Sequence, residues 1–76
     1  MEKPTTVIAS LALNNFGGIE ILELDDANET VTWRYHYHKA YEPQTTGWLF
    51  DEVTGEPYVI IDGSRYDFDQ FIRTDL

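Results

Sequence analysis

The sequence predicts a small, mainly β protein: an antiparallel sheet of five to six strands with a short C-terminal helix. Residues 31–38 alternate apolar and polar side chains without a break, further apolar runs are separated by turn residues, and only the last residues show helical spacing. A meander is the simplest connection, and closure as an SH3-like barrel is the alternative. With 76 residues, we expect residues 1–76 to form one domain.

The central strand is expected at residues 31–38, V-T-W-R-Y-H-Y-H. Side chains on a strand point alternately to opposite faces, so one face is apolar and mostly aromatic, and the other is polar. We expect the core to receive Val31, Trp33, Tyr35 and Tyr37, and water to receive Thr32, Arg34, His36 and His38.

Two strands are expected before it. Residues 5–13 fit both a strand and helical spacing, but their β-branched start and lack of charge favour a strand. In residues 19–24, I-E-I-L-E-L, the alternation slips in the middle. A β-bulge at Ile21-Leu22 explains this slip, with Glu20 and Glu23 in water and four side chains in the core: Ile19, Ile21, Leu22 and Leu24. The alternative is a strand covered on both faces, with Glu23 turned inward.

After the central strand, residues 39–46 read as a surface loop containing Pro43. Strands are expected at 47–51 and 57–61, joined by a turn at Thr54-Gly55, with Pro57 at a strand start, where a missing N–H is tolerated. Asp62-Gly63 predicts a tight hairpin that leads into a returning strand at 64–66.

The C-terminal segment changes its period. Phe68, Phe71 and Ile72 fall at i, i+3 and i+4, and Asp67 with Gln70 resembles a capping box. We therefore expect a short helix that closes one end of the sheet with these three apolar side chains.

Charge and composition restrict the function classes. Fourteen acidic against five basic residues give a formal charge of −9, which disfavours direct binding to nucleic acid or to anionic membranes. There is no cysteine for disulfides or a thiolate zinc site, and no apolar run long enough to span a membrane. Residues 1–4 do not resemble a signal peptide, so we expect a cytoplasmic protein.

Acidic residues cluster in two of the expected turns, which a meander would place at the same end of the sheet. The resulting acidic rim comprises Glu23, Asp25, Asp26, Glu29, Asp51, Glu52 and Glu56. Such a rim can simply keep a small sheet soluble. It can also bind a basic protein surface, including by mimicking nucleic-acid phosphates. Calcium is a third reading, although the D-x-D-x-D-G spacing of a calcium loop is absent.

The two histidines are the other candidate site. His36 and His38 would share one face of the central strand, at a separation from which two imidazoles can bind one zinc or nickel ion. Glu20 or Glu23 is the third ligand that we can place, while Arg34 on the same face disfavours a cation. The competing reading is two histidines that simply face solvent.

Catalytic motifs are lacking: Ser10 and Ser64 lie outside any nucleophile-elbow motif, there is no phosphate-binding loop, and a sheet this small offers little room for a cavity. We therefore predict a non-enzymatic accessory or interaction protein without a cofactor, which binds another protein through a sheet edge or the acidic rim. A nucleic-acid-mimicking inhibitor of a basic DNA- or RNA-binding protein and a weak metal-binding domain are the alternatives. The uncharged N-terminal strand would be an open edge for a partner or a homodimer, unless a barrel hides it.

Overall fold

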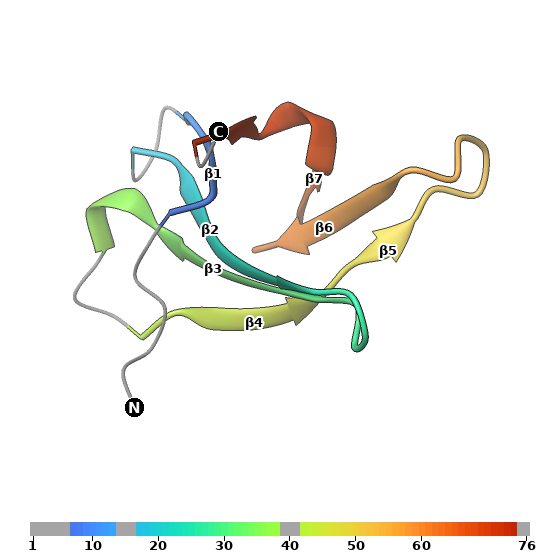
Figure 1. The fold of residues 1–76 in the computed structure, drawn as a ribbon. Coiled ribbons are helices and arrows are strands. Elements are labelled where there is room, and N and C mark those ends of the chain that lie inside the picture. Colours follow the sequence, from blue (N-terminus) through green and yellow to red (C-terminus); the bar gives the residue numbers. More distant parts are fainter. Residues whose placement is uncertain (1–6, 14–16, 39–41, 75–76) are drawn as a thin grey trace.

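The computed structural model describes residues 7–13, 17–38 and 42–74, and it is mainly β, as predicted. The strands form two antiparallel sheets, one five-stranded with the order β4-β3-β2-β1-β8 and one three-stranded with the order β5-β6-β7. Figure 1 shows the chain passing directly from β4 into β5, and so from the first sheet to the second. Strands β1 to β4 and β5 to β7 each follow one another as in a meander, but they are divided between two sheets instead of forming one.

The first sheet contains β1 (Ala9–Leu11), β2 (Ile19–Asp25) and β3 (Thr30–Tyr35) in its centre. The predicted β-bulge is confirmed, because the register between β2 and β3 shifts between Ile21 and Glu23. Its side-chain assignment was partly wrong. Leu24 is 42% exposed, whereas Glu20 is only 7% exposed, because Arg34 on the neighbouring strand neutralises its carboxylate.

The central strand is shorter than predicted. Val31 and Trp33 are buried as expected, but β3 ends at Tyr35, opposite Ile19, the first residue of β2. Without further partner residues on β2, the chain turns into a 3-10 helix, η1 (His36–His38). The expectation for Tyr37 was therefore wrong, and its side chain is 74% exposed.

Strand β4 (Gln44–Gly47) lies where a surface loop was expected, and it pairs with β3 along its whole length. The pairing is supported by side chains, since Trp33 Nε1 donates to Thr46 Oγ1 at 3.0 Å and Thr32 Oγ1 lies 3.1 Å from Thr45 Oγ1. Hydrophobic alternation misses such a strand because it contains no apolar side chain: its two central residues are threonines, which are β-branched but polar.

The second sheet contains β5 (Leu49–Phe50), β6 (Pro57–Ile61) and β7 (Ser64–Asp67). Pro57 starts β6 as expected. The predicted hairpin at Asp62-Gly63 is confirmed: both residues have positive φ, 52° and 81°, as a two-residue type I′ turn requires. Between β4 and β5, the Trp48 ring packs edge-to-face on Phe68, with ring centroids 5.4 Å apart.

One core receives side chains from both sheets: Ala9, Ile19, Ile21, Val31 and Trp33 from the first, and Val59 and Ile61 from the second. Phe68 and Phe71 pack against this core. The predicted C-terminal helix is reduced to one 3-10 turn, η2 (Phe68–Gln70), in which Asp67 N donates to Gln70 Oε1 at 2.7 Å. No helix in the described ranges is long and apolar enough to cross a membrane.

After η2 the chain forms a last strand, β8 (Ile72–Arg73), which pairs with Ala9 and Ser10 of β1. Ile72 is therefore 73% exposed instead of filling the core. The pairing also overturns the open N-terminal edge, since β1 lies between β2 and β8. Within the described chain, the uncharged edge of this sheet is β4.

Candidate functional site

The first acidic turn joins β2 to β3, and one of its carboxylates shapes the turn. Asp25 accepts hydrogen bonds from Asn28 Nδ2 at 2.8 Å and Asn28 N at 3.2 Å, and these bonds hold the pKa of Asp25 below its ordinary value. Three other acidic residues of this turn and of the end of β2 are exposed: Glu23, Asp26 and Glu29.

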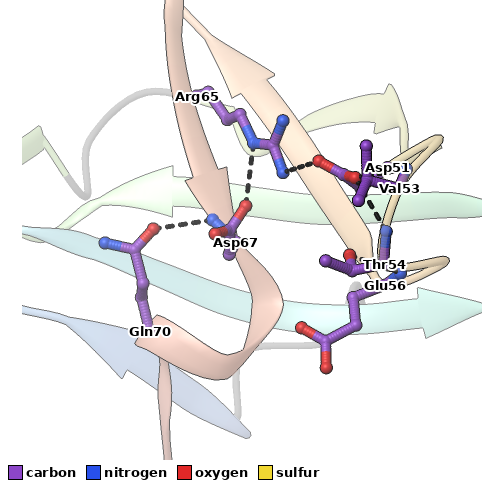
Figure 2. Close-up of polar contacts among 7 residues, drawn as sticks. All are labelled: Asp51, Val53, Thr54, Glu56, Arg65, Asp67 and Gln70. Atoms are coloured by element: carbon purple, nitrogen blue, oxygen red, sulfur yellow. Dashed lines mark hydrogen bonds and ion pairs between the residues drawn. The ribbon is translucent and has the colours of Figure 1, made fainter.

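The second acidic turn joins β5 to β6 and is built around Asp51 (Figure 2). Its Oδ1 accepts hydrogen bonds from Val53 N at 2.7 Å and Thr54 N at 3.0 Å, and its Oδ2 lies 2.8 Å from Arg65 Nη2. The Thr54 N–H, the Arg65 guanidinium and the Val53 N–H lower the pKa of Asp51 to about 2. Asp51 is therefore a structural carboxylate that is already satisfied within the chain.

Arg65 is held by its own neighbours on the outer face of the second sheet. Its Nε donates to Asp67 Oδ1 at 2.9 Å, and its guanidinium carbon lies 3.9 Å from the centroid of the Tyr58 ring. The bonds to Asp51 and Asp67 raise the pKa of Arg65. This cation is consequently neutralised by two carboxylates before any partner approaches.

The predicted acidic rim is thus divided by the fold. Its members lie on two turns that belong to different sheets, and Figure 1 shows the tips of these turns apart from each other. Asp25 and Asp51 serve as turn acceptors. The other five members are exposed, and within the described residues none of them forms an ion pair: Glu23, Asp26, Glu29, Glu52 and Glu56.

The histidines do not occupy one strand face, because η1 replaces the end of the predicted strand. His36 Nδ1 lies 3.0 Å from Glu20 Oε2, while Arg34 Nε donates to Glu20 Oε1 at 2.9 Å. Of the two residues expected as a third metal ligand, Glu20 does contact His36 but also pairs with Arg34, and Glu23 is exposed. No group of three metal-ligating side chains occurs among the described residues, which do not include the side chain of His38.

The structure also brings Ser10 and His36 to one hollow of about 230 Å³, which Glu20 lines as well. Sequence order alone did not place a histidine near either serine. In the described part of the chain, Ser10 and His36 form no hydrogen bond with each other, the contact by which a base activates a hydroxyl nucleophile.

A cleft of about 400 Å³ opens between the two sheets, although the sequence indicated little room for one. Most of its lining is apolar, and Glu56, Asp69 and Arg73 also line it. Its volume lies within the range of about 300–1,000 Å³ that is typical of ligand sites. Leu24 lies opposite the buried Val31 on β3, on the core-facing side of the sheet, and it lines the cleft instead of filling the core.

Comparisons with protein-family models, with curated proteins and with solved structures found no match to this chain.

Proposed function

We propose that this protein is a non-catalytic interaction module that binds a basic surface of another protein through the exposed carboxylates of its two acidic turns. The supporting observation is the unequal use of charge. Arg34 and Arg65 form ion pairs inside the molecule, whereas the five exposed members of the acidic rim form no ion pair in the described structure.

Physical chemistry links this arrangement to binding. Unneutralised carboxylates on protruding turns attract a basic partner over distances comparable to the screening length, about 8 Å at physiological salt. Because these two arginines are already paired inside the molecule, they do not compete with a partner's lysines and arginines for the exposed carboxylates. DNA- and RNA-binding proteins carry such basic surfaces, so nucleic-acid mimicry is the narrower form of the same proposal.

The test uses a fourfold variant, Asp26→Asn, Glu29→Gln, Glu52→Gln and Glu56→Gln, which leaves Asp25 and Asp51 in place. Wild-type protein and variant are immobilised and exposed to soluble extract of the source organism, and retained proteins are eluted with a salt gradient. We expect basic proteins that elute from the wild type at moderate salt and that the variant does not retain. Retention by both proteins, or elution independent of salt, would contradict the proposal.

A purified partner then permits titration calorimetry. We expect the affinity to fall steeply as salt rises, and competition by duplex DNA would assign the narrower, mimicry form. The cytoplasm is the compartment that we propose, because small secreted domains are usually stapled by disulfides and this chain has no cysteine. Cell fractionation tests that placement.

Self-association is a second candidate, favoured by the uncharged and mostly exposed edge strand β4. Unprotected edges pair readily with a second copy. Sedimentation at micromolar concentration is expected to show a dimer that Gln44→Lys dissociates, with Val53→Lys, on a 93% exposed side chain of the β5–β6 turn, as the control. A wild-type monomer throughout that range would exclude it.

A further inference from the structure

The cleft between the sheets has an apolar interior built by both of them. On one side, Ile21 and Ala9 are direct neighbours across β2 and β1, and β8 continues the same row. On the other side lie the start of β6 and the aromatic residues around η2. The apolar lining consists of Ala9, Ile21, Leu24, Pro57, Phe68 and Phe71.

Leu24 shows that the molecule's own side chains leave this interior partly open. The bulge in β2 interrupts the register before Leu24, and the side chain remains 42% exposed while it lines the cleft. When an apolar side chain of a partner covers an exposed leucine beside a concave apolar surface, apolar area is removed from water. This burial favours binding.

The charged residues at the cleft indicate the sign of the charge that a partner should carry. Glu56 and Asp69 are both exposed, and neither forms an ion pair within the described chain. In Figure 2 the Glu56 side chain is directed away from the Asp51–Arg65 pair. Arg73 is the basic residue of the lining, so carboxylates outnumber cations here, and the whole chain carries −9.

We propose that this cleft binds a bulky apolar side chain of a basic partner segment, a leucine or phenylalanine flanked by lysine or arginine. The apolar side chain enters between Leu24 and the phenylalanines, and the flanking cations meet Glu56 and Asp69. This inference rests on the proposed function, because it identifies the part of the basic partner that is recognised. Buried apolar anchors beside polar rims carry most of the binding energy in many interfaces.

The probe is the acetylated and amidated hexapeptide Lys-Lys-Leu-Phe-Lys-Lys, titrated into ¹⁵N-labelled protein and followed by NMR. We expect shifts concentrated at the amides of Ala9, Ile21, Leu24 and Asp69. Replacing the central Leu-Phe by Ser-Ser is expected to weaken binding about ten- to a hundredfold, because the anchor is lost. Replacing the lysines by glutamines is expected to weaken it about two- to tenfold.

Matched variants separate the cleft from the general acidity. Glu56→Gln and Asp69→Asn are each expected to weaken peptide binding about two- to fivefold, whereas Val53→Lys, which changes the net charge by the same amount in the same turn but outside the cleft lining, leaves it unchanged. Leu24→Ala is expected to weaken it by a similar factor, whereas Leu49→Ala, another exposed leucine outside the cleft lining, has no effect.

Three results would overturn this inference. Equal losses for Glu56→Gln and Val53→Lys would show attraction by the overall charge alone and would leave the proposed function standing. Equal affinities for the Leu-Phe and the Ser-Ser peptides would show that no apolar side chain is bound in the cleft. Shifts of the cleft amides on diluting the protein without peptide would assign the cleft to a second copy of the chain. The proposed function is read separately, from partner retention by the variant Asp26→Asn, Glu29→Gln and Glu52→Gln, which leaves Glu56 and Asp69 at the cleft unchanged.

Discussion

The hydroxyl of Tyr35 donates a hydrogen bond to Asp62 Oδ2, and this contact connects the end of β3 in the first sheet to the β6–β7 turn of the second. Burial, together with the Asp62 carboxylate, raises the pKa of Tyr35 above its ordinary value of 10.0. The protonated hydroxyl thus joins the two sheets directly, at a position far from the β4–β5 connection.

This contact predicts a loss of stability in alkali. Because the pKa of Tyr35 is higher in the folded than in the unfolded chain, the stabilisation is complete below about pH 10 and is lost as the pH rises further. Ultraviolet titration should show one tyrosine that ionises only on unfolding. Tyr35→Phe should remove that late-ionising tyrosine and cost about 1 kcal/mol in urea unfolding at neutral pH. A Tyr35 that ionises at its ordinary pKa of 10.0 would contradict the prediction.

Asp51 predicts a loss of stability in acid. Its pKa is lowered from 3.8 to about 2 in the folded chain, so its contribution is present above about pH 4 and is lost as the pH falls toward 2. The urea midpoint of the wild type should fall across this window. Asp51→Asn should flatten that part of the profile, whereas Glu52→Gln, on an exposed neighbour, should leave it unchanged. Equal profiles for the wild type and Asp51→Asn would refute this role.

The Glu20–Arg34 pair predicts a large loss of stability on one-sided removal. Both side chains are largely buried, so Glu20→Ala leaves the guanidinium of Arg34 without its carboxylate and should cost about 3 kcal/mol. Glu23→Ala, on an exposed side chain of the same strand, should stay within about 0.5 kcal/mol of the wild type. The double variant Glu20→Met with Arg34→Met should regain most of the loss. Urea unfolding measures all three, and similar costs for Glu20→Ala and Glu23→Ala would contradict the prediction.

Two glycines predict different penalties for the same substitution. A Cβ at Gly63 has no atom within 4 Å, so Gly63→Ala pays only for its positive φ, about 1 kcal/mol. A Cβ at Gly18 would lie 2.3 Å from the Leu11 carbonyl oxygen, where β1 meets β2, and φ there is 115°. Gly18→Ala should therefore cost about 3 kcal/mol or more and weaken the amide protection of β1. Urea unfolding and hydrogen exchange measure both effects, and equal penalties would show that the close approach is relieved.

The features that the sequence predicted correctly are local ones. The alternation around Trp33, the slip at Ile21-Leu22 and the Asp62-Gly63 turn depend on neighbouring residues, and all three appear in the structure. The pairings of β4 and β8 were missed because they are set by strands distant in sequence, and short polar strands carry no hydrophobic signal.

The candidate site was harder to predict for the same reason. The two acidic turns were identified, but their relative position depends on the number of sheets, which local patterns do not contain. The burial of Glu20 follows from its partner Arg34 on β3, and the cleft exists only where β2 and β1 meet β6 and η2. The alternation of apolar and polar residues, from which Glu20 was predicted to face water, contains no information about these contacts between strands.

The pairing of β8 with β1 also determines when the fold can be completed. Thr74 Oγ1 donates to the carbonyl oxygen of Val7 across 67 positions of the chain. The edge strand β8 therefore cannot pair with β1 until residues 72–74 have been synthesised. A nascent chain still held in the ribosome at that point exposes the second side of β1 to any neighbouring strand. Pairing of β1 with a neighbouring chain in place of β8 is therefore the route by which this protein is expected to aggregate during folding.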